Sequence, residues 1–477
     1  MNLHEHISKL IEKKRDKMIE LSDQIWSCPE IYFEEHQSSK YICQALEEEG
    51  FQVEREVAGL QTGFIGSYGT GKPIIAILGE FDALSGLSQQ KGLAEHAPLV
   101  SGGHGHGCGH NLLGTGSFAA AVAVKEYMEQ TGLKGTVRYY GCPAEEAGSG
   151  KAFMARAGLF DDVDLALSWH PSSVAGIWNV STLANYSATF KFNGKSAHAA
   201  AAPHLGRSAL DAVELMNIGV NYLREHMIPE ARVHYAITDT GGTSPNVVQP
   251  HAEVVYFIRA PKKQQVIDLY ERVCNIAKGA ALMTGTTMEV EFEGTASDLI
   301  PNTALAEIMY KNLMAVGVPS YDEFDRKFAK EIHATLSPED IRADLAGLDK
   351  ETAKKLKDKE IADLIPPLGD EAALSGSTDV GDVSWVVPTM QCLTTCFAIG
   401  TPLHTWQVVS QGAMPIGHKG MLQAGKVIAC TAIEAMQNQD IIDQAKAEWK
   451  ERLEGEPYVS LIPEDVVRPQ KAVCVQK

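Results

Sequence analysis

The stretch GGHGHGCGHN occupies residues 102–111 and continues directly into LLGTGSFAAAVAVKEYMEQ at residues 112–130. Its first part places three histidines and one cysteine between glycines, whose backbone freedom lets several side chains turn toward one point. Imidazole and thiolate groups are ligands that borderline-soft divalent ions prefer. The second part is rich in small and apolar residues, which predicts a helix packed closely against a sheet. The N-terminus of that helix would favour the thiolate form of Cys108.

Four interpretations of this stretch are open from these residues alone: a metal-buffering tract, a loop of solvated histidines, a nucleotide-binding loop and a catalytic site. The segment GSYGTGKP at residues 66–73 has the spacing of a P-loop, but Pro73 replaces the required Ser or Thr and a strand follows instead of a helix. The chain also lacks the GxSxG motif of serine hydrolases and the HExxH motif of zincins. These observations exclude those three classes of site.

Short apolar runs bounded by Gly and Pro alternate with longer segments of helical period, which predicts an α/β fold with a mostly parallel sheet covered by helices. The runs PIIAILGEFDAL, GTVRYYGCPAEE, VDLALSWHP and CFAIGTPLHTW each end in polar residues. The residues at these strand ends are Glu80, Asp82, Glu145, Glu146, His170 and His404. Because open α/β sheets bind ligands beyond the carboxyl ends of their strands, we expect these side chains to gather there.

The pattern changes between residues 187 and 297, where the predicted order is strand, helix, strand, strand, helix, strand. This order is typical of a ferredoxin-like α+β unit, here inserted into a larger domain formed by residues 1–186 and 298–437. Residues 323–370 are rich in Lys, Asp and Glu and predict a solvated helical excursion at the surface. Residues 438–477 are predicted to form a C-terminal tail.

Length and charge limit the classes of function. A chain of 477 residues is too long for one ordinary core, so two domains are expected. The net charge of −19 argues against nucleic acid or an anionic membrane as a partner, and no run of 18 apolar residues is present. Nine scattered cysteines without CxxC pairs fit a reducing compartment, so we expect a cytoplasmic protein. An anionic substrate would then need local cations.

Adjacent Glu145 and Glu146 can point in different directions, so one carboxylate can bind a metal while the other faces a water molecule. A lone His is more often structural than a ligand, but several candidates converge on one sheet edge. The convergent ligands are Cys108, His110, Glu146, His170 and His404, with His104, His106 and His418 as further candidates. Five ligands exceed what one tetrahedral ion uses and suit two ions that share a bridge.

The motifs GCGHN, PAEEAGSGK, SWHP, KSAHAA, SPNVV followed by YFIRA, and GTPLHT occur in this order. In that order they resemble the metal-dependent N-acyl amino acid amidohydrolases related to carboxypeptidase G. The similarity covers nearly the whole chain, including GEFDALSGLSQQ and STDVGDVSW. It implies a phosphorylase/hydrolase-like catalytic domain with a mixed, mostly parallel sheet, and a dimerisation or lid domain at residues 187–297.

The resemblance implies that the five convergent ligands hold two divalent ions, either Mn²⁺ or Zn²⁺, and that Glu145 is the general base. It implies that His198 reaches an active site, that of a partner subunit, to stabilise the oxyanion. Asn246 and Arg259 match positions that bind the carboxylate of the substrate, although Arg259 could instead pair with an internal acid. The related enzymes commonly carry Asp where this chain has Asn111, so that position supplies no carboxylate to orient His110.

The activity implied by the resemblance is hydrolysis of the amide bond of p-aminobenzoyl-glutamate to p-aminobenzoate and glutamate. The alternatives are another N-acyl amino acid or a dipeptide as substrate, or a metal-binding subunit that is active only with a partner subunit. The expected assembly is a homodimer or a heteromer with a homologous subunit.

Overall fold

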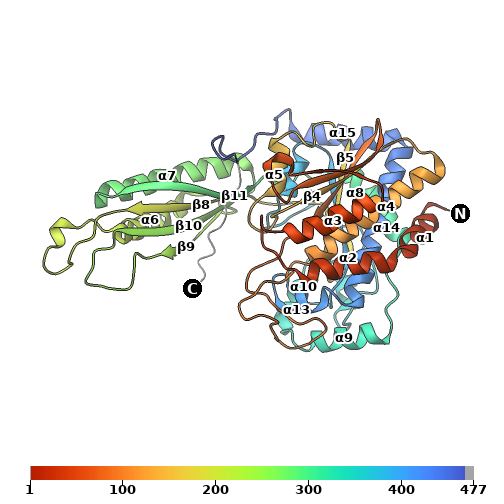
Figure 1. Cartoon of the computed structure of the whole chain (residues 1–477), viewed down its shortest axis with the longest axis horizontal. Coiled ribbons are helices and arrows are strands. Elements are labelled where there is room, and N and C mark those ends of the chain that lie inside the picture. Colours follow the sequence, from red (N-terminus) through yellow and green to blue (C-terminus); the bar gives the residue numbers. More distant parts are fainter. Residues whose placement is uncertain (1, 468–477) are drawn as a thin grey trace.

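The computed structural model describes residues 2–467, in which two sheets lie end to end (Figure 1). The larger sheet and most of the helices form one body, and the smaller sheet extends from it with two long helices. Within the described residues, no helix combines the length and apolarity needed to cross a membrane.

The larger sheet has seven strands in the order β1-β2-β4-β3-β5-β13-β6. Their bounds are Gln52–Arg55 (β1), Phe64–Thr70 (β2), Ile74–Glu80 (β3), Gly135–Cys142 (β4), Leu165–Ser172 (β5), Gly176–Ile177 (β6) and Thr389–Thr395 (β13). The four neighbours β4, β3, β5 and β13 are parallel, whereas β1, β2 and β6 pair antiparallel at the edges. The predicted α/β fold with a mixed, mostly parallel sheet is confirmed. Its parallel strands all end at one edge, where the polar residues follow them.

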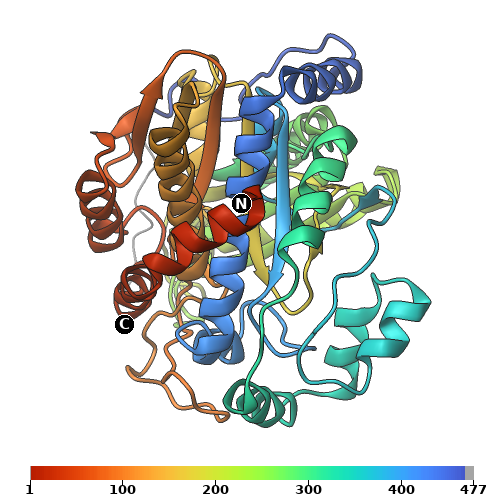
Figure 2. The same cartoon turned by 90° about the vertical axis from the view of Figure 1, so that its right-hand side faces the viewer.

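One face of this sheet is covered by helix α4 (His110–Thr131), which begins within the glycine-rich stretch, as predicted. Alternating residues of β3 divide between the two faces, so Ile75 and Ile77 pack on the α4 side while Ala76 and Leu78 pack on the other. Figure 2 shows α4 beside α14 (Pro415–Gln437) and α8 (Thr303–Val316) in front of the sheet. The same face carries helices α1 (Leu3–Lys13), α2 (Arg15–Ser27) and α3 (His36–Glu48).

The other face of the sheet is covered by the short helices α5 (Gly150–Arg156) and α12 (Val380–Ser384), which pack against each other. A small parallel pair, β7 (Val180–Ser181) with β12 (Ala372–Ala373), lies apart from both larger sheets. Helix α13 (Trp406–Gln411) follows the loop that leaves β13. These short elements surround the carboxyl ends of the parallel strands.

The smaller sheet is antiparallel, with the order β11-β8-β10-β9. Its strands are β8 (Ala184–Asn193), β9 (Arg232–Asp239), β10 (His251–Ala260) and β11 (Thr287–Ala296). Helices α6 (Ala209–Leu223) and α7 (Lys263–Thr284) pack together on one face of it, which leaves the opposite face free to line a cavity. Strand β8 already begins at Ala184, ahead of the predicted boundary at residue 187.

The charged excursion contains the helices α9 (Glu323–His333), α10 (Pro338–Leu345) and α11 (Lys350–Leu356). It is more than a solvated decoration, because Phe328, Ile332, Leu345 and Leu356 are buried in small apolar clusters with the loop after β13.

The predicted tail does not begin at residue 438. Helix α15 (Gln439–Leu453) packs against α8, and its buried side includes Ile441 and Ile442. Leu461 and Ile462 are also buried, so the polar composition of this segment concealed a narrow apolar face. Residues 468–477, which complete the predicted tail, lie outside the described residues.

The contact between α4 and β3 leaves no room for a methyl group at Gly114, because an added Cβ would lie 2.6 Å from the backbone oxygen of Glu80. We expect Gly114→Ala to lower the free energy of unfolding by roughly 1–3 kcal/mol, measured by urea denaturation. The control is Gly279→Ala in α7, where an added Cβ meets nothing within 4 Å. Equal losses in the two variants would contradict the close contact.

Candidate active site

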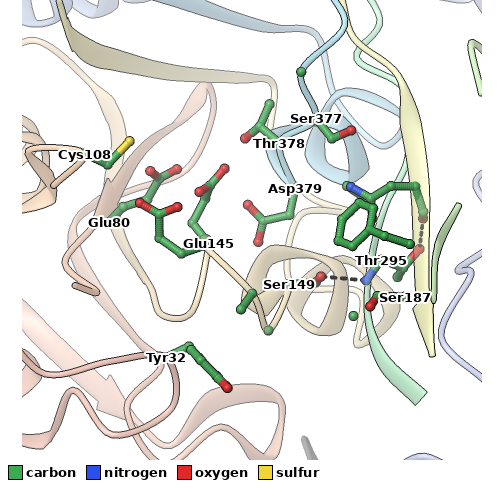
Figure 3. A pocket seen from close by; sticks show the side chains of 18 of the residues that line it. Tyr32, Glu80, Cys108, Glu145, Ser149, Ser187, Thr295, Ser377, Thr378 and Asp379 are labelled. Carbon is green, nitrogen blue, oxygen red and sulfur yellow. Dashed lines mark hydrogen bonds between the residues drawn. The ribbon is translucent and has the colours of Figure 1, made fainter. Parts of the chain in front are cut away.

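A cavity of about 630 Å³ lies between the carboxyl ends of the parallel strands and the free face of the smaller sheet (Figure 3). Six of the nine predicted site residues line it: Cys108, Glu145, Glu146, His170, Arg259 and His404. His110 lies directly behind Cys108 and His170, within ligand distance of both. The structure therefore brings seven of the predicted residues together, from segments far apart in the sequence.

Cys108 and His110 stand at the start of α4, where Gly109 has a φ of 79° that a residue with a side chain rarely adopts. His170 comes from the end of β5, and its Nε2 lies 3.3 Å from the Sγ of Cys108. The Nδ1 of His170 donates to the carbonyl oxygen of Pro171 at 2.8 Å, which directs the Nε2 lone pair at Cys108 and His110.

Glu146 and His404 form the second part of the cluster. Nε2 of His404 lies 3.3 Å from Oε2 of Glu146. His404 has a left-handed backbone, with a φ of 61°, and its N–H donates to the carbonyl oxygen of Gly107 at 2.7 Å. This hydrogen bond ties the loop after β13 to the glycine-rich stretch, which explains why two segments nearly 300 residues apart meet here.

Two sets of three ligand atoms share Cys108: one with His110 and His170, and one with Glu146 and His404. Within each set, the atoms lie within 4.8 Å of one another. Two buried polar atoms of these sets, Nε2 of His110 and Oε1 of Glu146, have no hydrogen-bond partner. A buried polar atom without a partner is costly, and a cation is the partner that a lone pair can accept. These residues therefore fit two adjacent cations.

Asp82 supplies the carboxylate that Asn111 does not. Its Oδ1 accepts a hydrogen bond from Nδ1 of His110 at 2.8 Å, and its Oδ2 accepts one from the N–H of Glu146 at 2.9 Å. Asn111 instead donates to Ser22 and to the carbonyl oxygen of Gly412. One aspartate thus orients a candidate ligand from each of the two sets.

A buried ion-pair network lies beside the cluster. The Nζ of Lys151 lies 2.7 Å from Glu80 and 2.6 Å from Asp379, and the side chains of all three are almost fully buried. The second oxygen of Glu80 lies 3.3 Å from Nε2 of His110. Figure 3 shows the carboxylates of Glu80, Glu145 and Asp379 converging on one side of the cavity.

Sequence reasoning missed Lys151 and Asp379 and did not assign a role to Glu80 or Asp82. The signal was present, because these residues fall in GEFDAL, PAEEAGSGK and STDVGDVSW, all of which belong to the recognised motif order. What the sequence did not give was the pairing between them.

Negative charge dominates the electrostatics of the cluster. Burial, with the charges of Glu80 and Glu146, raises the pKa of Glu145 well above its ordinary value. Burial and the charge of Glu146 likewise raise the pKa of the Cys108 thiol, so the expectation that the helix N-terminus favours the thiolate was wrong for the protein without cations. Cations at the two sets of ligands would reverse both effects, because they favour the charged forms.

Arg259 faces the cluster from β10, across the cavity. Its Nη1 donates to Oγ of Ser377 at 3.0 Å, and its guanidinium lies over the ring of Phe257 at 4.4 Å. Among residues 2–467, no carboxylate forms an ion pair with it, so internal pairing with an acid is not what the structure shows. A fixed guanidinium with free donors is suited to a carboxylate of a ligand.

His198 and Asn246 do not line the cavity of their own chain. Both are exposed on neighbouring loops of the smaller sheet, where the N–H of Ala199 donates to the carbonyl oxygen of Asn246 at 2.9 Å. The Nδ1 of His198 accepts from the N–H groups of Ala200 and Ala201, which leaves Nε2 as the protonated nitrogen. The structure thus pairs these two residues with each other and separates them from the cluster.

The other histidine candidates have structural contacts or lie outside the two ligand sets. His106 is fully buried, with Nε2 3.1 Å from the carbonyl oxygen of Ile25, and burial lowers its pKa to about 4. Nε2 of His418 lies 2.8 Å from Oδ1 of Asp23, and His104 belongs to neither set.

The profile of peptidase family M20/M25/M40 matches residues 76–381. One of the two kinds of subunit of the p-aminobenzoyl-glutamate hydrolase of Escherichia coli (strain K12) is 49% identical over 472 residues, covering 97% of this chain and 98% of that protein. The Xaa-Arg dipeptidase of Mus musculus is 28% identical, covering 96% of this chain and 94% of that protein. The solved aminobenzoyl-glutamate utilization protein from Klebsiella pneumoniae has a TM-score of 0.55 at 16% identity, covering 91% of this chain and 98% of that one, and so shares the fold.

Removing Lys151 tests the balance of charge beneath the cluster. We expect Lys151→Met to lower the free energy of unfolding of chelator-treated protein by roughly 3–5 kcal/mol at pH 8, because Glu80 and Asp379 lose their counter-ion. The deficit should shrink at pH 5, since the folded variant can then protonate carboxyl groups whose pKa values are raised, whereas in the wild type burial already raises the pKa of Asp379 to about 6. Urea denaturation at both pH values measures it.

The matched control is Lys327→Met, whose side chain is 77% exposed on α9 and should cost less than about 0.5 kcal/mol at either pH. A deficit for Lys151→Met that is small, or that grows toward acid, would contradict the proposed balance.

Proposed function

Because the chain belongs to peptidase family M20/M25/M40, we propose that it hydrolyses the amide bond of p-aminobenzoyl-glutamate to p-aminobenzoate and glutamate. Membership of this family of hydrolases confirms the family that the order of motifs predicted. The substrate is supported by the name of the Escherichia coli relative that is 49% identical. The observation that carries the proposal is one cavity in which an unpaired Arg259 faces the Cys, His and Glu cluster.

We propose that Cys108 with His110 and His170 holds one divalent ion, and that Cys108 with Glu146 and His404 holds a second. Either Mn²⁺ or Zn²⁺ suits a mixture of thiolate, imidazole and carboxylate ligands. Ions bound there would lower the pKa of a water molecule and polarise the amide carbonyl of the substrate.

The side chains around the cluster then have separate tasks. The carboxylate of Glu145 takes a proton from the attacking water and returns it to the nitrogen of the leaving amine. The guanidinium of Arg259 binds a carboxylate of the glutamate, which fixes the amide next to Glu145 and offsets the repulsion from a chain of net charge −19. Because Cys108 must remain reduced for this chemistry, we place the activity in the cytoplasm.

The first test combines metal removal with a Glu145 variant. We expect chelation to abolish release of p-aminobenzoate and Mn²⁺ or Zn²⁺ to restore it. Glu145→Gln should retain about two metal ions per chain yet lose roughly 100- to 10,000-fold in kcat. Elemental analysis and an absorbance assay of the aromatic product measure the two quantities.

The control for this test is Glu54→Gln, which changes an exposed carboxyl group on β1 and should leave both quantities unchanged. Unchanged turnover by metal-free protein, or by Glu145→Gln with its metal bound, would overturn the proposed mechanism.

A dipeptidase is the second candidate, because Glu293 on β11 lines the same cavity as Arg259. Glu293 accepts a hydrogen bond from Oγ1 of Thr189 at 2.6 Å and forms no ion pair with any cation of residues 2–467. A cationic side chain of a leaving amino acid could therefore pair with it, as the name of the Mus musculus Xaa-Arg dipeptidase suggests. Rates on glutamate and arginine amides with the same acyl group decide between the two substrates.

We propose that the smaller sheet binds another subunit of the same fold. Its edge strand β9 is almost entirely exposed, and the apolar side chains of Ile218, Tyr222, Tyr235 and Ile237 are exposed around it. Such an edge is a template for strand pairing. The name of the Escherichia coli relative makes it one subunit of a hydrolase, so the partner is a homologous subunit, with a second copy of this chain as the alternative. In either assembly His198 would reach the cavity of the partner and stabilise the oxyanion.

A mixing experiment tests this role of His198. If two copies of this chain pair, inactive His198→Ala and Glu145→Gln proteins should regain up to about a quarter of the activity when subunits exchange, because one cavity per mixed dimer is complete. Recovery that requires a homologous subunit instead would identify the heteromer. Exchange confirmed by differently tagged chains, without any recovery in either mixture, would contradict action across the interface.

A further inference from the structure

A second cavity, of about 350 Å³, lies on the far side of His170 from Arg259. It shares His170, Trp178 and Leu403 with the first cavity, so the two meet at the candidate metal cluster. A volume of this size is within the range of about 300–1,000 Å³ that small-molecule sites occupy. The cluster therefore stands between two hollows, and the function proposed above has used only one of them.

The wall of the second cavity comes from the charged excursion. Ala343 and Asp344 of α10 line it, opposite Leu393 of β13 and the loop of residues 400–403. Helix α10 is held firmly in place, because Leu345 is buried with Val174 and Ile399 beneath it. The excursion thus supplies a fixed surface next to the site.

The interior of this cavity is apolar along its sides and polar at one end. Trp178, Leu393, Pro402 and Leu403 provide the apolar surface, and 43% of Leu403 is exposed although it is a large apolar residue. A flat ring placed between these side chains would cover that exposed surface.

Asp344 provides the polar end. Its Oδ1 accepts a hydrogen bond from Oγ of Ser173 at 2.6 Å, and its Oδ2 accepts one from the N–H of Gly400 at 2.7 Å. These two bonds fix the carboxylate and leave a second lone pair on each oxygen. A ligand with an N–H or O–H group at its far end could donate to it.

We propose that the second cavity is the acyl-group pocket, which takes an aromatic acyl group carrying a hydrogen-bond donor at its far end. The inference rests on the proposed function, because Arg259 then binds the leaving amino acid in the first cavity. An amide held at the cluster must send its two halves in opposite directions. The acyl half enters between Trp178 and Leu403, and its terminal donor, an aromatic amine in p-aminobenzoyl-glutamate, reaches Asp344.

Filling the pocket tests its occupant. Ala343→Trp places a large side chain in the cavity from an exposed position of α10, and Ala346→Trp places the same side chain just past the end of that helix, outside the cavity. We expect Ala343→Trp to lower kcat/KM for p-aminobenzoyl-glutamate and benzoyl-glutamate at least about 10-fold more than for acetyl-glutamate. Ala346→Trp should not change the ratio between these substrates.

Asp344→Asn tests the polar end. Wild-type protein should prefer p-aminobenzoyl-glutamate to benzoyl-glutamate, and the variant should reduce that preference at least about 5-fold, because a neutral amide accepts a hydrogen bond more weakly than a carboxylate. A purely structural role for Asp344 would lower both rates equally and keep the ratio.

The outcomes separate this inference from the proposed function. Loss of activity on all three substrates in equal proportion in Ala343→Trp, or no loss, overturns the acyl pocket while leaving the hydrolase intact. If wild-type protein hydrolyses none of the three, the proposed function falls, and calorimetric titration with p-aminobenzoate decides the pocket alone. Affinity weakened at least about 10-fold by Ala343→Trp and not by Ala346→Trp supports it. Equal affinity in both variants, or no binding to the wild type, overturns it.

Discussion

The structure depends on holding several carboxylates at one buried edge of a sheet with few cations to balance them. Glu80, Asp82, Glu145 and Glu146 follow adjacent parallel strands, and Asp379 joins them from the start of α12. Within residues 2–467, Lys151 is the lysine that forms an ion pair inside this group, and it satisfies only Glu80 and Asp379. The remaining negative charge raises the pKa values of Glu145 and Cys108, so the fold creates a demand for divalent cations.

Much of this arrangement could be predicted because it follows from local pattern and strand order. A buried run that ends in Glu145 or His170 must deliver that residue to the carboxyl edge if the strands are parallel, so separate runs predicted one site. The orientation of His110 could not be predicted in this way. The expected position, Asn111, points at Ser22, while Asp82 takes over from the end of a neighbouring strand. Which of two nearby carboxylates meets an imidazole depends on side-chain packing that spacing does not contain.

The excursion of residues 323–370 shows a second limit of sequence reasoning. Its charged composition correctly indicated helices with a solvated side, but the few apolar residues that fix α10 against the loop after β13 carry no strong periodic signal. The same limit applies to α15, whose buried Ile441 and Ile442 are surrounded by polar residues. Composition reports the larger, exposed face of a short helix, whereas function here depends on the smaller, buried one.

The two cavities divide the recognition of a substrate from its chemistry. Arg259 is kept free of acidic partners by its contacts with Ser377 and Phe257, so it can bind a carboxylate despite the net charge of −19. Asp344 is fixed by Ser173 and Gly400 on an element that takes no part in the cluster. Because these two walls belong to different segments, either can change its preference for one half of the substrate while Glu145 and the ligand sets stay as they are. A family that acts on many amides would gain new specificities through such segments, and the charged excursion is where this chain carries its own.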